Sequence, residues 1–272
     1  MAVVQGARAL FRHWVREEAR ALAGWAAAAA LLAAGLGVLA LRVGQLGEFL
    51  ALFERNLERL PAVLRLLGGK AALRDPSALV LAALFRTAAP VLLLVWSSSA
   101  VLRIYTAEAS AGTLEFLLSL PVTRVRLLAA RIAAYGLGLA VLVAALSGGA
   151  WVGMVWGGGT VSGTATARAG LGLFVLFACL GGLGFLVSLA FRDHTQGLLA
   201  LLGVQFLLFA AGTAVEGGGE GVWGLLNPYG HYAAAREWTG GAAGAWGELG
   251  VLAAGAAVLW WLGGVVFVRR QL

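Results

Sequence analysis

The sequence is poor in charged residues. Of its 272 residues only 12% are charged, while 61% are hydrophobic and a further 40 are glycine. Soluble domains contain about 25% charged residues, so this chain has too little polar surface to cover a water-soluble globule. Disordered chains are rich in charge and poor in apolar side chains, which excludes them as well. The composition predicts a polytopic membrane protein.

Residues for redox and metal chemistry are also scarce. The single cysteine, Cys179, lies inside an apolar run, so no disulfide can form within the chain. The three histidines, which are His13, His194 and His231, are scattered and form no cluster with metal-ligand spacing. The only lysine, Lys70, is not in a P-loop motif, so ATP cannot bind by that route. We therefore expect no catalytic residue, metal site or cofactor in this chain.

Six apolar runs are long enough to cross a membrane. A helix needs about 20 residues to span a hydrocarbon core of about 30 Å. The runs cover residues 21–41, 78–102, 132–156, 169–191, 195–215 and 249–268. They should be helices, because lipid offers no partner for an open strand edge, and the alternating segments of a barrel are absent. The predicted fold is an all-α integral membrane protein in which residues 1–272 form a single transmembrane domain.

The distribution of charge predicts the orientation of these helices. If the N-terminus is cytoplasmic, the cytoplasmic segments contain eleven arginines and five acidic residues. The outer segments then contain eight basic and eight acidic residues. Because an excess of basic residues marks the cytoplasmic side, both termini are predicted to be cytoplasmic.

The N-terminal segment 8–20 is predicted to be an amphipathic helix lying in the membrane interface. Arginines at every fourth position cover one arc of this helix, and apolar residues cover the opposite arc. Glu18 falls within the apolar arc. Two interpretations are open for it, a solvated or ion-paired side chain and a contact with a partner protein.

Two longer segments are expected on the outer side. Residues 42–77 contain an apolar helical face, which predicts one or two short helices on the membrane surface. A lid, a docking point or simple interfacial packing would each account for that face. Residues 216–248 are rich in glycine and contain aromatic residues, among them Tyr229 and Tyr232, that suit the headgroup level. An Asn-Pro break would let part of this segment re-enter the membrane.

Arg86 is the only full charge inside a predicted span. Charges at that depth usually face a cavity or a partner, which would place Arg86 on a transport pathway. It also lies toward the outer end of its span, from which a long side chain can reach the interface. The position favours the second interpretation over the first.

Small residues recur at intervals of four in two spans. Gly149, Gly153 and Gly157 do so in the third span, and Ala178 and Gly182 in the fourth. This spacing allows close contact between helices in membranes. In a chain with 40 glycines the same spacing also arises by chance.

The segment 103–131, between the second and third spans, carries the most informative motif. It contains the run GTLEFLLSLPVTR between flanking acidic and arginine residues. This run resembles the GTLE-L-L-S-x-P-[VL]-[ST]-R motif of the permease subunits of ABC transporters of the type-2 exporter class. The matching residues are Glu108, Gly112, Thr113, Leu114, Glu115, Leu118, Ser119, Pro121, Val122, Thr123 and Arg124. The Gly-Lys pair of the family is replaced by Ala130-Arg131.

A second, weaker match precedes the last span. Asn227, Pro228, Tyr229 and His231, followed by two glycines, are similar to an N-P-[FY]-x-H…G run of the same family. The six spans, the inside termini and the amphipathic N-terminal helix agree with the family over the whole chain.

The resemblance implies that the chain works with partners. It would pair with a second copy or a related permease in the inner membrane of a prokaryotic cell, and separate cytoplasmic ATPase subunits would bind ATP and magnesium. The segment 103–131 would contact those ATPases as a coupling helix. The residues implied in coupling are Glu108, Gly112, Thr113, Leu114, Glu115, Phe116, Leu117, Leu118, Ser119, Pro121, Arg124 and Arg131. Besides these proteins we expect the lipid bilayer, and no nucleic acid, as a partner.

Two other functions stay open. The chain would be a membrane scaffold or assembly factor if residues 42–77 recruit a partner on the outer side. It would be an ion-gradient-driven secondary carrier if Arg86 binds an anion. No cluster of ligands and no charged pathway in the sequence selects a transported substrate.

Overall fold

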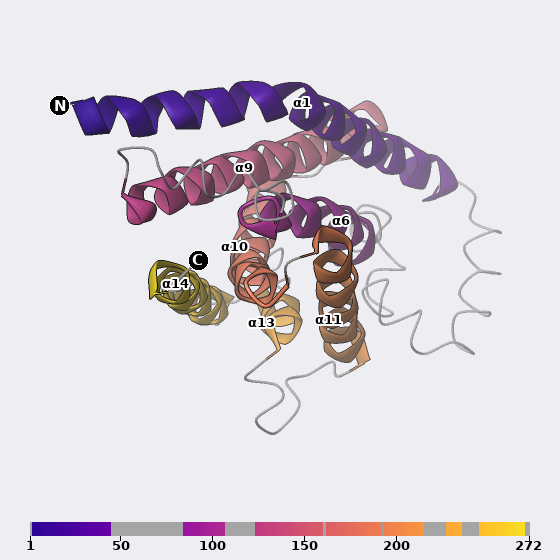
Figure 1. Ribbon diagram of the computed structural model, residues 1–272. Helices are drawn as coiled ribbons and strands as arrows, with labels where there is room; N and C mark the ends of the chain where they lie inside the picture. Colours follow the sequence, from indigo (N-terminus) through magenta and orange to yellow (C-terminus); the bar gives the residue numbers. More distant parts are fainter. Residues whose placement is uncertain are drawn as a thin grey trace.

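The computed structural model describes residues 2–44, 84–106, 123–159, 162–191, 193–214, 227–235 and 245–269. Within them the elements are α1 (Ala2–Gly44), η1 (Leu84–Ala88), α6 (Ala89–Leu102), α9 (Arg124–Trp156), α10 (Gly163–Ser188), α11 (His194–Ala214), α13 (Pro228–Ala235) and α14 (Ala245–Arg269). Figure 1 shows them as a bundle of helices. Six helical segments of the described chain are long and apolar enough to cross a membrane. The prediction of an all-α membrane protein with six spans is confirmed.

The first helix is longer than any membrane requires. α1 continues without a break through both the predicted interfacial helix at 8–20 and the first span at 21–41. Its 43 residues extend over about 65 Å at 1.5 Å per residue, about twice the thickness of the hydrocarbon core. The part apolar enough to cross is Glu18–Leu39, so the N-terminal part of α1 continues beyond the core.

Other helices also start outside the runs that hydropathy marks. α9 begins at Arg124 instead of residue 132, so the end of the predicted link 103–131 belongs to the helix of the third span. α10 covers Gly163–Ser188 instead of residues 169–191. Hydropathy marks the part of a helix that fits in lipid, whereas the backbone hydrogen bonds of a helix can begin or end elsewhere.

α10 lies at the centre of the bundle. It packs against α14, α9, α6, α13 and α11, which surround it in Figure 1. In its most apolar stretch 61% of the residues are buried, against 17% in α1. The outer helices therefore leave most of their apolar side chains exposed on the outside of the bundle, while α10 and α6 form the core.

Small residues bring α1 and α9 into backbone contact. The two helices run side by side (Figure 1), with Gly149 against Ala30 and Gly153 against Ala34. A Cβ atom on either glycine would collide with the carbonyl oxygen of the facing alanine. Because the contacts advance together along both chains, the helices are parallel, as two spans that cross in the same direction must be. The regularly spaced glycines Gly149 and Gly153 of the third span thus form the surface on which α1 packs.

The small residues Ala178 and Gly182 of the fourth span likewise allow α14 to approach α10 closely. A Cβ atom on Gly182 would lie 2.8 Å from the Cβ atom of Leu259. One turn earlier, the indole N–H of Trp260 donates to the carbonyl oxygen of Ala178 at 2.9 Å. Close approach and a side-chain hydrogen bond together hold α14 on the central helix.

A buried tyrosine joins four helices in the middle of the bundle. The hydroxyl of Tyr135 on α9 donates to the carbonyl oxygen of Phe177 on α10 at 2.8 Å. Since its only hydrogen goes there, the hydroxyl of Ser97 on α6, also 2.8 Å away, must be the donor to Tyr135. The Tyr135 ring stacks on Trp96 and contacts Trp260 of α14, with centroids 5.8 and 5.6 Å apart. The hydrogen bonds satisfy polar groups that would otherwise be costly in the core.

Candidate functional site

The predicted coupling residues divide into two groups. Arg124 and Arg131 are described and lie in the first turns of α9. The others lie outside the described residues: Glu108, Gly112, Thr113, Leu114, Glu115, Phe116, Leu117, Leu118, Ser119 and Pro121. The candidate site is therefore built from the two ends of the link, at residues 103–106 and 123–131.

At the first end, the last residues of the second span are tied to the start of the fifth. The hydroxyl of Thr106 donates to the carbonyl oxygen of Leu102 at 2.7 Å. The hydroxyl oxygen of Thr106 also lies 3.1 Å from Nδ1 of His194, the first residue of α11. Because the threonine hydrogen is already used, the imidazole Nδ1–H is the donor in this contact. Thr106, the last described residue on this side of the link, is thus held against the start of α11.

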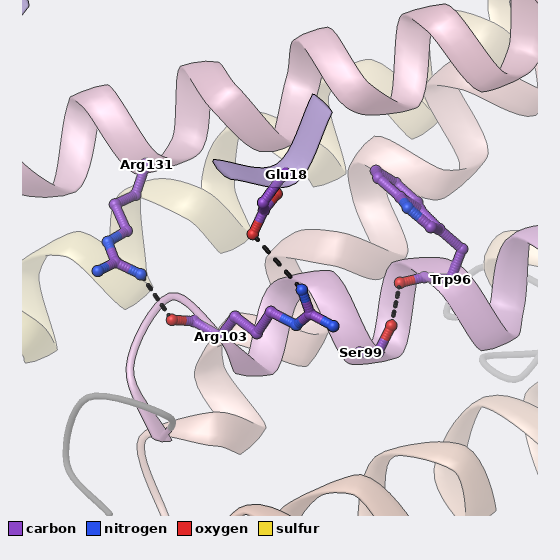
Figure 2. Close-up of polar contacts among 5 residues, drawn as sticks. All are labelled: Glu18, Trp96, Ser99, Arg103 and Arg131. Carbon is purple, nitrogen blue, oxygen red and sulfur yellow. Dashed lines mark hydrogen bonds and ion pairs between the residues drawn. The ribbon is translucent and has the colours of Figure 1, made fainter. Parts of the chain in front are cut away.

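The second end of the link is bonded directly to the first. A guanidinium nitrogen of Arg131 donates to the carbonyl oxygen of Arg103 at 2.7 Å, as Figure 2 shows. Arg103 is the C-cap of α6, where carbonyl groups lack partners inside the helix and attract positive charge. This contact joins the end of α6 to the start of α9, so the two ends of the link are held next to each other.

An ion pair adds α1 to this arrangement. A carboxylate oxygen of Glu18 lies 3.8 Å from a guanidinium nitrogen of Arg103 (Figure 2). The ion-paired interpretation of Glu18 is therefore confirmed, and its partner belongs to the same chain. About half of each side chain is exposed, and such pairs contribute at most about 1 kcal/mol. The pair positions α1 beside the link without fixing it rigidly.

A groove lies directly behind this ion pair. It exists because α1 packs along α9 while α6 packs on α10 and α11, which leaves α9 as a floor between α1 and α6. Figure 2 shows Trp96 on one side of the ion pair of Glu18 and Arg103, with Arg131 on the other side. The residues lining it are Glu18, Ala21, Leu22, Trp25, Trp96, Ser99, Ala100, Arg103, Ala134, Leu137 and Gly138. The groove is apolar along its length and charged at its mouth.

At the opposite end of the second span, the helix widens into a π turn. This turn, η1, precedes Pro90 in the first turn of α6. In a π turn a carbonyl accepts from the N–H five residues later, and for Phe85 that residue is Pro90, which has no N–H. The hydroxyl of Tyr232 on α13 supplies the missing donor, 2.8 Å from the Phe85 carbonyl oxygen.

Arg86 is one of the residues of this π turn. It is half-buried, at the beginning of the described part of the second span. This location, away from the link ends and the groove, is the outer end in the predicted orientation.

The second family-like run, from Asn227, forms the start of α13. The side-chain oxygen of Asn227 accepts from the backbone N–H of Tyr229 at 3.0 Å, and its amide donates to the carbonyl oxygen of Leu208 on α11 at 3.1 Å. The ring of Tyr229 packs edge-on against Phe209, with centroids 5.3 Å apart. The run therefore anchors α13 to α11.

The tyrosines of α13, for which the sequence predicts the lipid headgroup level, are packed against other helices of the protein. Tyr229 and Tyr232 are only 4% and 2% exposed, because α13 packs against α14, α11 and α10. Burial, reinforced by the neighbouring Tyr232, raises the pKa of the Tyr229 hydroxyl above its usual value. Next to them His231 pairs with Glu248 of α14 through Nδ1. The motif thus holds helices together on one side of the bundle.

The polar groups of the described chain join helices and form no reactive constellation. Among these residues there is no group of three or more His, Cys, Asp or Glu that could hold a metal ion. The polar contacts described above lie at the ends of the link, around α13 and around Tyr135 in the core.

Comparison with known proteins identifies a matching family. Residues 67–272 match the model of a family described as ABC-2 family transporter protein. Most of the chain lies in this range, including both family-like runs, and α1 lies outside it. Among curated proteins, none shows significant similarity to the chain.

Proposed function

The chain belongs to the ABC-2 transporter family, and from that premise we propose that it is the permease subunit of an ATP-driven exporter. Membership of this family confirms the resemblance noted in the 103–131 segment. It also implies association with an ABC ATPase, which is the partner that we expect to bind ATP and magnesium. The permease itself would be non-catalytic and would lie in the inner membrane of a prokaryotic cell.

The observation that best supports coupling is the hydrogen bond between Arg131 and the Arg103 carbonyl oxygen. A force applied by an ATPase to the link would reach the second and third spans together, because this bond joins their ends. The ion pair to Glu18 extends the connection to α1. Movement of the ATPases would therefore tilt three helices at once.

We further propose that two permeases, identical or related, form the export path between them. The six spans of one chain form a packed core around α10. A path along a shared interface needs no opening of that core. Substrate would then move where two chains meet, and the link of each chain would receive the force of one ATPase.

The direct test is purification of the tagged chain from native membranes, followed by identification and ATPase assay of companion proteins. We expect a companion with ATPase activity. Glu115→Arg and Leu118→Asp should each abolish that association while the permease still folds and inserts. Arg168→Glu is the matched control, because this exposed arginine lies in the first turns of α10, far along the chain from the link.

The alternatives predict different outcomes. Retention of the ATPase by both link variants would refute the coupling role of the segment 103–131. Absence of any ATPase, with loss of function on deletion within residues 42–77, would favour the scaffold. Uptake driven by an ion gradient, insensitive to ATP and lost in Arg86→Ala but not in Arg86→Lys, would favour the carrier.

A further inference from the structure

The groove between α1 and α6 has the chemical character of a site for an amphiphile. Two tryptophans and two leucines line it, on a floor of small residues from α9. Its mouth carries the half-exposed ion pair of Glu18 and Arg103. A purely apolar ligand would make no polar contact with this ion pair. A small ion would leave the apolar side chains of the groove without a contact.

The exposed apolar area inside the groove needs a partner of matching shape. Trp25 is 37% exposed and Leu137 is 44% exposed, although both line a concave surface. The groove has a volume of about 50 Å³, so a short part of an acyl chain would lie in it and cover these side chains, and each buried methylene would contribute about 0.8 kcal/mol. Tryptophan rings also favour the interface between headgroups and acyl chains, which is where the mouth of the groove would lie.

The charges at the mouth select the headgroup. Arg103 lines the groove with Glu18, and the guanidinium of Arg131 is bonded to the Arg103 backbone (Figure 2). Arg131 does not itself line the groove, but its guanidinium lies beside the Arg103 backbone and adds to the positive charge there. The pair of Glu18 and Arg103 is long and half-exposed, so a phosphate that binds both ends of a guanidinium fork can replace it. The mouth favours an anionic headgroup over a cationic one.

We propose that this groove binds one anionic phospholipid of the membrane, with its phosphate on Arg103 and one acyl chain along Leu22, Trp25 and Leu137. The lipid would contact α1, α6 and α9 together, beside both ends of the link. In the predicted orientation this end faces the cytoplasm, whose leaflet carries anionic lipid in many membranes. Lipid binding requires no ATPase, so a test of lipid binding is independent of a test of the proposed function.

The test is a lipid titration of the purified full-length protein in detergent, followed by native mass spectrometry. Phosphatidylglycerol and phosphatidylcholine of the same chain length are the probes. Both lipids carry the phosphate, but the choline cation of phosphatidylcholine offsets its charge beside Arg103, so we expect phosphatidylglycerol to bind about fivefold more tightly, a difference of about 1 kcal/mol. Arg103→Gln should remove this preference, and Arg103→Lys should retain part of it because the charge remains.

A second pair of variants tests the apolar part of the groove. Ala134 lines the groove, whereas the adjacent Ala133 is exposed and does not. Ala134→Phe should therefore weaken binding of both lipids, and Ala133→Phe should not. Arg269→Gln is the matched charge control, because Arg269 is an exposed arginine at the end of α14 and does not line the groove. Unfolding midpoints from tryptophan fluorescence establish that each variant is folded.

Three results would overturn the proposal. The first is an unchanged lipid preference in folded Arg103→Gln together with unchanged binding in Ala134→Phe. The second is displacement of the lipid by inorganic phosphate alone, which would mean that the acyl chain contributes nothing. The third is tighter binding of a cationic amphiphile that is lost in Glu18→Gln, which would assign the groove to ligands of the opposite charge.

Discussion

The hydroxyl of Tyr232 donates a hydrogen bond to the backbone carbonyl oxygen of Phe85, which lies 2.8 Å away. The two residues are 147 positions apart in the chain. The carbonyl group of Phe85 needs a donor, and the buried hydroxyl of Tyr232 needs an acceptor. Pro90 leaves the carbonyl of Phe85 without its backbone donor, and a side chain from the short helix α13 replaces that donor. The π turn in the second span therefore depends on α13.

Tyr232→Phe should destabilise the protein by about 1–3 kcal/mol, because it leaves a buried carbonyl group unsatisfied. The matched control is Tyr229→Phe, on the same helix. Tyr229 is equally buried, but its hydroxyl has no hydrogen-bond partner among the described residues, so its removal should be neutral or stabilising. Unfolding midpoints of both variants in the same detergent provide the measurement. Equal effects of the two changes would show that the hydroxyl of Tyr232 has no special role.

The raised pKa of Tyr229 predicts a loss of stability at alkaline pH. An unfolded tyrosine releases its proton near pH 10, whereas the buried hydroxyl keeps it to higher pH. The folded state then binds more protons than the unfolded state, so the free energy of unfolding falls as the pH rises above about 10, by up to about 1.4 kcal/mol per pH unit. Tyr229→Phe should lose stability less steeply over this range. Parallel curves for the two proteins would contradict the prediction.

The number and type of the membrane helices could be predicted from the sequence because each follows from local composition. A run of apolar residues has to be helical in lipid, whichever neighbour it meets. The same reasoning could not place helix ends such as Arg124, because these lie outside the lipid-spanning stretch. It also could not assign Tyr229 and Tyr232 to the interior, since their burial depends on the packing of α13 against three other helices.

In the candidate site, too, some features could be predicted from the sequence and others could not. The motif in the segment 103–131 was recognisable because its residues are consecutive in the chain. Its connection to Glu18 joins residues far apart in sequence, and only an acidic residue in an otherwise apolar arc signalled it. The contact of Tyr232 with Phe85 was signalled in the sequence only by Pro90. A proline inside a span leaves a backbone carbonyl group without its N–H donor, so another part of the chain has to supply one.

Gly149→Ala should separate α1 from α9. The new Cβ atom would collide with the carbonyl oxygen of Ala30, and overpacking of this kind costs about 1–3 kcal/mol. Gly148→Ala is the matched control, because a Cβ atom on the neighbouring Gly148 meets nothing within 4 Å. The difference in unfolding midpoint between the two variants measures the helix contact directly. A smaller effect at Gly149 than at Gly148 would mean that α1 does not pack here.

Arg131→Gln should loosen both ends of the link, because it removes the charge from the hydrogen bond to the carbonyl oxygen of Arg103. A lost stabilisation of about 1 kcal/mol corresponds to about fivefold faster amide exchange in residues 103–106. Arg126→Gln is the control, since this exposed arginine lies on the same first turns of α9. Hydrogen–deuterium exchange of the purified protein makes the comparison.

The same pair of variants separates structure from coupling. If the bond between Arg131 and Arg103 carries force from the link to the second and third spans, Arg131→Gln should bind the ATPase normally. It should nevertheless reduce the stimulation of ATPase activity by the permease, while Arg126→Gln leaves both unchanged. Faster exchange with full stimulation would mean that the bond only stabilises the ends of the helices. Lost ATPase association would instead place Arg131 in the docking surface itself.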